Sequence, residues 1–167
     1  MFDFRLKILK IASLKKSLSA LKRKGKVIAF TNGCFDILHR GHVSYLAAAK
    51  KDLSRVLVVG INSDISVRLL EKGPERPIVP QAERAAVLAG LESVDFVIIF
   101  DEATPYELIK KVQPDILLKG ADWKGREVAG ADIVKAYGGR VEFVKYINNL
   151  SSTHVIEKIK MLCQKQS

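Results

Sequence analysis

Residues 27–50 read VIAFTNGCFDILHRGHVSYLAAAK, and this stretch decides the fold. Its first five residues, 27–31, are too few for a helix and almost entirely apolar, which is typical of a strand buried on both faces in a parallel sheet. From Val43 to Lys50 the apolar residues recur with a helical period. A buried strand, a glycine-containing turn and a helix form the first part of a βαβ unit.

The same alternation continues to about residue 145. Four more short runs rich in Val, Ile and Leu predict strands over 55–60, 94–100, 115–118 and 140–145. Helical periodicity separates or flanks them over 82–91, 105–112 and 131–137, with further helices expected over 13–24 and 152–163. Strands that alternate with helices imply right-handed crossovers. We therefore predict an α/β fold: a doubly wound, Rossmann-like sheet of five parallel strands with helices on both faces.

Local signals mark the ends of these elements. Thr104 before Pro105, with Glu107 three residues after Thr104, predicts an N-cap and a capping box, and the pair Gly138-Gly139 predicts a helix end. The stretch EKGPERPIVP, residues 71–80, combines three prolines, a glycine and four charges and predicts a long irregular loop. Loops of this length inside a compact domain are usually functional.

Composition excludes several classes of protein. The chain has 167 residues, 48% hydrophobic and 28% charged, which suits one soluble domain with a single core. Its two cysteines, Cys34 and Cys163, form no CxxC or Cys/His cluster, so we expect neither a zinc site nor a disulfide, and a reducing compartment. No apolar run reaches the 18 or so residues that span a bilayer, and the N-terminus lacks a secretory h-region. We expect a cytoplasmic protein.

The positive charge is concentrated at the N-terminus. Residues 1–26 hold nine Lys and Arg against one acid, whereas residues 27–167 hold nineteen against seventeen, so the net charges are +8 and +2. This basic segment is expected to be a solvated helix face; the alternatives are a contact with a partner or another copy, or attraction to nucleic acid or a membrane surface.

Polar residues follow the first strand directly, where an open α/β sheet binds ligands. The sequence TNGCFDILHRGH, residues 31–42, matches neither GxxxxGK[ST] nor GxGxxG. It places His39 and His42 at a helix start, with Gly41 between them. A helix N-terminus favours phosphate, Gly41 allows close approach of the backbone, and imidazoles donate hydrogen bonds to phosphate oxygens. The spacing predicts a phosphate site; alternatively, one histidine caps the turn and the other lies on the helix surface.

The string TNGCFDILHRGH resembles the HxGH signature of the nucleotidyltransferase superfamily, which includes cytidylyltransferases and pantetheine-phosphate adenylyltransferases. Within it the chain is most similar to the heptose 1-phosphate adenylyltransferases, over residues 27–160. The further matching segments are 60–64, 76–78, 83–95, 114–122 and 151–153. On this resemblance we divide the chain into a basic helical extension, 1–26, and a nucleotidyltransferase domain, 27–167.

The resemblance implies three groups of site residues. The residues implied to hold the reacting phosphates and neutralise their charge are His39, His42 and Lys119. Those implied to bind the nucleotide are Thr31, Asn32, Gly33, Cys34, Phe35, Gly41, Asn62, Arg84, Ser151, Ser152 and Thr153. Those implied to bind the sugar phosphate are Asp36, Arg68, Lys72, Arg76, Asp122 and Trp123.

Each role has a structural alternative. Lys119 is either a phosphate ligand or a strand-end lysine that reaches to solvent, and Arg84 either enters the site or pairs on the surface. Ser152 and Thr153 either bind phosphate or cap the last helix. Asn62 either contacts the ligand or caps the next helix. Cys34 is interpreted as a small turn residue rather than a nucleophile.

The implied reaction joins ATP and a sugar 1-phosphate to give an ADP-sugar and pyrophosphate. Its nucleophile is a phosphate oxygen already ionised at pH 7, so no general base is needed. Mg²⁺ is expected as a cofactor, held mainly by the ATP phosphates, and no metal ligand is predicted. We expect ATP and the sugar 1-phosphate as partners, a homodimer, and neither nucleic acid nor a membrane. Because such transferases are often fused to a sugar kinase, we expect a separate kinase to supply the acceptor.

Two alternative functions stay open. One is a cytidylyltransferase acting on glycerol 3-phosphate or another small phosphate. The segment 148–151, Asn-Asn-Leu-Ser, lacks the arginine and glycine of the RTxGIS pattern of glycerol-3-phosphate cytidylyltransferases, whereas 120–125, GADWKG, resembles them. The other, supported only by the net charge of +10, is a nucleotide- or nucleic-acid-binding protein without catalysis.

Overall fold

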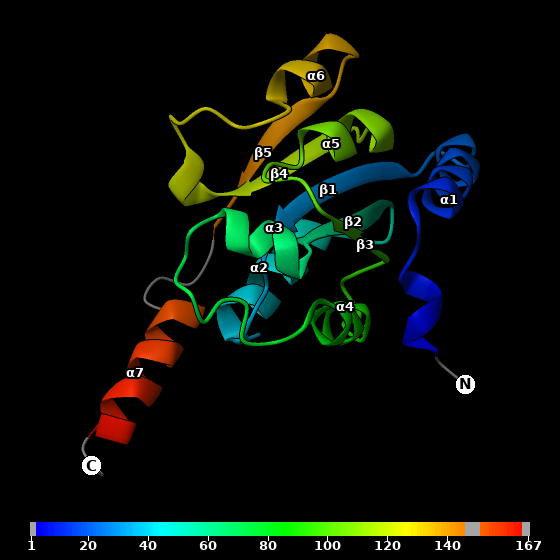
Figure 1. Ribbon diagram of the computed structural model, residues 1–167. Helices are drawn as coiled ribbons and strands as arrows, with labels where there is room; N and C mark the ends of the chain where they lie inside the picture. The colour runs from blue at the N-terminus through cyan, green and yellow to red at the C-terminus, as the bar shows by residue number, and fades with distance from the viewer. Residues whose placement is uncertain (1–2, 146–150, 165–167) are drawn as a thin grey trace.

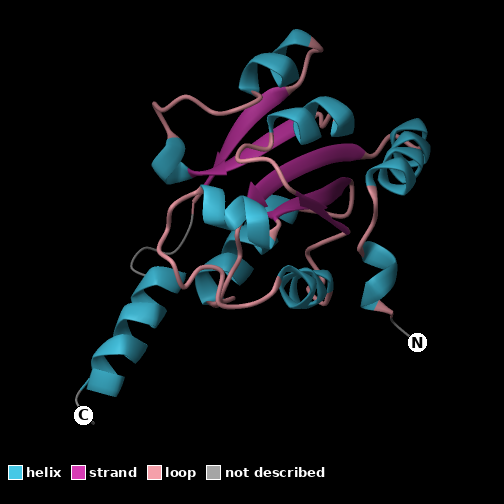
Figure 2. Cartoon of the chain, viewed as in Figure 1, coloured by secondary structure: helices cyan, strands magenta, loops and turns pink. Residues whose placement is uncertain are grey.

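The computed structural model describes residues 3–145 and 151–164. It contains a sheet of five parallel strands in the order β3-β2-β1-β4-β5 (Figures 1 and 2). The strands are β1 (Val27–Gly33), β2 (Arg55–Asn62), β3 (Phe96–Phe100), β4 (Ile116–Gly120) and β5 (Arg140–Val144). All five predicted strands and the doubly wound fold are confirmed.

The order of the strands shows at which edge of the sheet a ligand is expected to bind. The chain builds outward from β1 to β2 and β3, then returns to place β4 on the other side of β1. This reversal makes the carboxyl ends of β1 and β4 the switch point at which open α/β sheets bind ligands. Phe30 pairs with Leu117, so Asn32 lies opposite Lys119, two residues further along each strand.

Helices cover both faces of the sheet because its central strands are apolar in both directions. On one face Ile28 and Phe30 pack with α1 (Ile11–Arg23), α5 (Tyr106–Val112) and α6 (Ala131–Ala136). On the other face, Ala29 packs with α2 (Arg40–Lys50) and α4 (Gln81–Ala89). The remaining elements are η1 (Phe4–Lys7), α3 (Asp64–Leu69), η2 (Ala121–Trp123) and α7 (Ser152–Gln164).

The N-terminal segment shares this core. Leu14 and Leu18 of α1 are buried against the sheet, as the expected helix requires. Ile8 forms a parallel bridge with Val97, and the amide of Leu9 donates to the carbonyl of Val97, which the sequence did not predict. Residues 8–9 therefore cover part of the outer edge of β3, which would otherwise expose unpaired backbone groups.

Helix ends follow the predictions in part. Gly138 takes the left-handed conformation just beyond α6, with φ of 86°, and ends the helix as predicted. The capping box at Thr104 is wrong: α5 begins at Tyr106, Pro105 is its N-cap, and no side chain caps it. Residues 71–80 connect α3 and α4 without regular structure, as predicted. Among the described residues, no helix has the length and apolar character needed to cross a membrane.

Candidate active site

Two stacked imidazoles lie where β1 leads into α2. His39 is the N-cap of α2, and its Nδ1 accepts a hydrogen bond of 3.1 Å from the amide of Gly41. The rings of His39 and His42 stack with centroids 3.9 Å apart, and Phe35 contacts the ring of His42 at 5.2 Å. His39 Nε2 and His42 Nδ1 are buried without a hydrogen-bond partner among the described residues. Two ring nitrogens are therefore left to bind a ligand.

Burial keeps both rings neutral at pH 7. It lowers the pKa of His39, and it lowers the pKa of His42 to about 4, with a further contribution from the neighbouring His39. Because Nδ1 of His39 accepts a bond, its Nε2 carries the proton and is a donor. The start of α2 adds the positive end of a helix dipole. The arrangement suits an anion with several acceptor oxygens.

A buried ammonium lies at the end of the neighbouring strand. Lys119 is 8% exposed, and its Nζ donates to Oδ1 of Asn32 at 2.6 Å. The same nitrogen lies 5.0 Å from the ring centroid of Trp123. Burial lowers the pKa of Lys119 to about 8, partly opposed by the carboxylate of Asp122. At pH 7 the site therefore holds one positive charge between β1 and β4.

This pKa gives a testable pH dependence. As the pH rises through about 8, Lys119 loses its proton, and with it the site loses its attraction for the phosphates that the sequence predicts as ligands. We expect kcat/KM to fall above pH 8, with kcat falling at a higher pH because bound phosphate stabilises the ammonium. Lys119→Arg should abolish this alkaline limb, since arginine stays charged. A wild-type profile that is flat to pH 9.5 would contradict the assignment.

Arg84 holds three segments of the site together. Its side chain is 1% exposed, and Nη1 donates to the carbonyls of Cys34 at 2.6 Å and Asn62 at 2.8 Å. Nε donates to the carbonyl of Val79, and Nη2 pairs with Asp64 at 2.7 Å. The expected contact of Arg84 with the nucleotide has no support in this geometry, because the guanidinium is directed at protein groups. Arg84 instead joins the ends of β1 and β2 to the 71–80 loop.

Asp36 and Arg76 make a second buried connection. Asp36 accepts hydrogen bonds from the amides of Ile78 and Val79 at 3.0 and 2.8 Å. Arg76 Nε lies 2.6 Å from Asp36 Oδ2, and both side chains are buried. The predicted sugar-phosphate contacts of Asp36 and Arg76 are therefore not supported. The pair fixes the 71–80 loop to the turn that precedes the imidazoles.

Replacing Asp36 with asparagine tests this connection. The change leaves the Arg76 guanidinium buried without a countercharge, which typically costs about 3–5 kcal/mol of unfolding free energy. We expect a loss of that order in urea denaturation. Asp52→Asn is the matched control: its carboxylate lies at the exposed start of a turn and bonds only locally, to Ser54, so a loss below about 1 kcal/mol is expected. Equal losses of unfolding free energy in the two variants would contradict this role of Asp36.

Most of the other predicted residues lie at or beside the site. Thr31, Gly33, Cys34, Phe35, Gly41 and Asn62 are at or beside the carboxyl ends of β1 and β2, as the sequence suggested. Lys72 Nζ lies 3.6 Å from Cys34 Sγ, so this exposed lysine is beside the site, whereas Arg68 is exposed on α3. Asp122 and Trp123 form η2, next to Lys119.

The start of α7 also reaches the site. Ser152 Oγ donates to the carbonyl of Ile37 at 2.9 Å, and Ser151 Oγ caps the helix by accepting from the amide of His154 at 3.1 Å. Thr153 is exposed. The helix is thus capped by Ser151 and not by Ser152 or Thr153, for which capping was the stated alternative. Ser152 ties α7 to the imidazole turn. Residues 148–150, on which part of the comparison with cytidylyltransferases depends, lie outside the described residues.

Sequence reasoning did not identify Tyr45. Its hydroxyl lies 2.8 Å from that of Thr31, and burial raises its pKa to about 12, so it is neutral. Tyr45 follows His42 by three residues on α2, a spacing that places both on one helix face and was available in the sequence. It anchors α2 to the end of β1.

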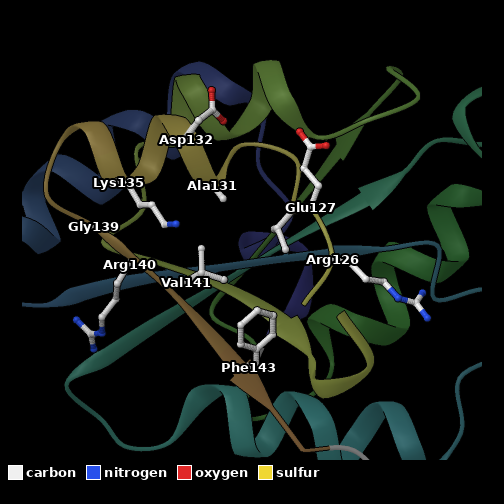
Figure 3. A pocket seen from close by; sticks show the side chains of 10 residues that line it. Arg126, Glu127, Ala131, Asp132, Lys135, Gly139, Arg140, Val141 and Phe143 are labelled. Carbon is white, nitrogen blue, oxygen red and sulfur yellow. The ribbon is translucent and has the colours of Figure 1, made fainter. Parts of the chain in front are cut away.

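A hollow of about 550 Å³ lies away from the imidazoles, between α6 and β5 (Figure 3). Val141 and Phe143 of β5 line it, together with residues of mixed charge such as Asp132 and Lys135. It contains none of the predicted site residues. We place the site at the switch point, because the two unpartnered ring nitrogens of His39 and His42 follow the end of β1 and the buried ammonium of Lys119 lies at the end of β4.

The sheet order and the imidazole pair at its switch point define a Rossmann-like fold of the nucleotidyltransferase type. The chain belongs to the cytidylyltransferase-like family, whose model matches residues 30–158. It is 51% identical over 158 residues to the bifunctional protein HldE of Geotalea uraniireducens, a match covering 95% of this chain and 32% of that protein. HldE of Nitratiruptor sp. is 56% identical over 84% of this chain and 29% of its own length. The chain thus spans about a third of these relatives.

Solved structures agree with the fold. The lipopolysaccharide core biosynthesis protein from Thermoplasma volcanium is 32% identical, with a TM-score of 0.58, covering 72% of this chain and 96% of that one. Pantothenate synthetase from Thermus thermophilus is 18% identical with a TM-score of 0.57, covering 89% of this chain and 67% of that one. The second likeness shows the fold alone.

Proposed function

We propose that this protein transfers AMP from ATP to D-glycero-β-D-manno-heptose 1-phosphate, giving ADP-heptose and pyrophosphate. The observation that carries the proposal is the stacked pair His39 and His42, each with an unpartnered ring nitrogen. The strand that leads to this pair carries Asn32, which accepts a hydrogen bond from the buried ammonium of Lys119. The HldE relatives support the choice of sugar, since they match nearly the whole chain.

In the proposed reaction an ionised oxygen of the sugar phosphate attacks the α-phosphorus of ATP. A P–O bond forms there as the bond to the bridging oxygen breaks, and its electron pair leaves with pyrophosphate. His39 and His42 donate hydrogen bonds to the triphosphate oxygens on which charge develops. Lys119 neutralises charge without transferring a proton. Catalysis then consists of alignment and electrostatic stabilisation.

Magnesium would enter with the nucleotide. Among the described residues, no three His, Cys, Asp or Glu side chains converge on one point. Asp36, the acidic residue nearest the histidines in sequence, is occupied by two amides and Arg76. We therefore assign no protein ligand to Mg²⁺, which when bound would neutralise triphosphate charge. The homodimer stays a prediction of the family resemblance, and the cytoplasmic location stays a prediction from the composition of the sequence.

Pyrophosphate release tests the proposal. Purified protein is assayed with ATP or CTP, each against heptose 1-phosphate and glycerol 3-phosphate. We expect turnover with ATP and the heptose phosphate at a kcat/KM at least a hundredfold above the other three combinations. Preference for CTP and glycerol 3-phosphate would instead establish the sibling cytidylyltransferase. Absence of pyrophosphate in all four mixtures would reject a transferase of this substrate class.

A further inference from the structure

Two uncharged groups hold the buried ammonium of Lys119. Oδ1 of Asn32 lies 2.6 Å from Nζ and accepts a hydrogen bond from it, and the ring centroid of Trp123 lies 5.0 Å away. Among the described residues, Asn32 provides the only hydrogen bond to this nitrogen. Because neither partner carries a charge, the ammonium is held in place without losing its positive charge.

The sheet brings Asn32 and Lys119 together. Phe30 of β1 is paired with Leu117 of β4, and alternate residues of a strand point to the same face. Asn32 and Lys119 lie two positions further along each strand, so they share that face at the carboxyl ends of neighbouring strands. Their separation is therefore set by the sheet, which positions side chains more precisely than a loop does.

A buried lysine depends on such a contact. Its ammonium is a point charge on a flexible stem, which by itself has no preferred direction. Burial disfavours the charged form and lowers the pKa of Lys119 to about 8. A hydrogen bond donated by the charged form opposes this effect of burial. Without Oδ1 of Asn32, the ammonium would lose its fixed position and would lose its proton at a lower pH.

The charged residues around Lys119 leave its ammonium without a directly bonded carboxylate. Asp122 of η2 favours the charged form and raises the pKa of Lys119, yet the two groups form no ion pair within the described part of the chain. Glu142 of β5 is paired with two arginines. On α6, Asp132 accepts from a tyrosine hydroxyl, and Lys135 is exposed. The asparagine oxygen is therefore the direct partner of the ammonium.

An amide oxygen suits this position better than a carboxylate. An aspartate in place of Asn32 would form an ion pair with Lys119, and the pair would have no net charge. The ammonium would stay protonated to a higher pH, but the added carboxylate would repel an approaching phosphate. Asparagine supplies the acceptor and leaves the positive charge available to a ligand.

We propose that Asn32 is a positioning residue, which fixes the Lys119 ammonium at the carboxyl ends of β1 and β4 and leaves its charge free to meet substrate phosphate. This role differs from the nucleotide contact that the family resemblance implies for Asn32. It rests on the proposed function, in which Lys119 neutralises phosphate charge during transfer of AMP.

A direct titration tests the contact without any assay of activity. The protein is labelled at the lysine Cε atoms and followed by NMR, and the signal of Lys119 is the one that Lys119→Arg removes. Asn32→Leu, which removes the acceptor at similar volume, should lower the pKa of Lys119 by about 1. Asn32→Asp should raise this pKa by about 1, because it adds a countercharge. An unchanged pKa of Lys119 in both variants would overturn the proposal.

The pH profile of pyrophosphate release tests the kinetic role. The alkaline limb of kcat/KM should move to lower pH in Asn32→Leu and to higher pH in Asn32→Asp. At pH 7, Asn32→Asp should still lose about tenfold or more in kcat/KM, although Lys119 is protonated, because the charge that attracts phosphate is cancelled. A limb that stays in place while the pKa of Lys119 moves would overturn this role of Asn32.

Controls separate the other causes. Ser19→Asp adds the same charge on the exposed surface of α1 and should leave both the pKa of Lys119 and the pH profile unchanged. Equal effects of Ser19→Asp and Asn32→Asp would show a net-charge effect and overturn the proposal. Asn32→Asp has the shape of the native residue, so it keeps the test decisive if Asn32→Leu does not fold. If the wild type releases no pyrophosphate, the proposed function fails, whereas the NMR titration still decides whether Asn32 holds Lys119.

Discussion

His42→Ala is expected to lower kcat for pyrophosphate release by about 10²–10³-fold, the usual effect of removing one positioned donor to a developing anion. The substitution also removes half of the stacked pair, so the remaining His39 ring loses its neighbour at 3.9 Å. His42→Asn, which keeps an N–H donor on a shorter side chain, should recover part of the activity. The measurement is kcat and KM with ATP and heptose 1-phosphate.

The third histidine provides the control for this prediction. His154 is exposed on α7, where its backbone amide donates to Oγ of Ser151. His154→Ala should leave kcat within about twofold. His39→Ala should lower kcat comparably to His42→Ala and also lose about 1 kcal/mol of stability, because His39 caps α2. Full activity in the variant lacking both rings would remove the basis of the proposed mechanism.

Arg84→Met is expected to reduce the free energy of unfolding by about 3–5 kcal/mol, the range for removing one partner from a buried charged network. The methionine fills the volume but leaves the carbonyls of Cys34 and Asn62 and the carboxylate of Asp64 without their donor. Arg84→Lys should recover little, since one ammonium cannot reach acceptors on three segments. Urea denaturation provides the measurement.

A control substitution on the surface and a kinetic measurement separate the two roles considered for Arg84, which are contact with the nucleotide and connection of three segments of the site. Arg126→Met, at an exposed position, should change stability by less than about 0.5 kcal/mol. If Arg84→Met were as stable as the wild type but raised only the KM for ATP, the residue would contact the nucleotide, as the sequence had suggested. A large loss of stability supports the connecting role seen in the structure.

The central strands were predictable because their short apolar runs are typical of strands buried on both faces of a parallel sheet. The imidazole site was also predictable, because HRGH lies in the segment that joins the first strand to the next helix. Its location needs only this local connectivity and the rule that ligands bind at the carboxyl ends of strands. The cap at Thr104 was predicted wrongly, since the choice between adjacent caps depends on contacts that a local pattern does not contain.

Arg84 and Asp36 show what local patterns could not provide. A buried arginine and a ligand-binding arginine look alike in sequence, and the partners of Arg84 come from residues up to 50 positions away. The same holds for Asp36, whose two amide donors lie 42 and 43 residues further along the chain. Their roles depend on distances between segments that only the folded chain defines.

The sequence by itself determined the class of fold, the place of the paired histidines and the excess of charge at the N-terminus. Those features follow from periodicity, composition and neighbours along the chain. The tertiary structure decided which polar groups are left without a protein partner at the switch point and which bond to other parts of the protein. The physical reason is that burial, which sets the cost of every unpaired polar group, is a property of the whole packed molecule.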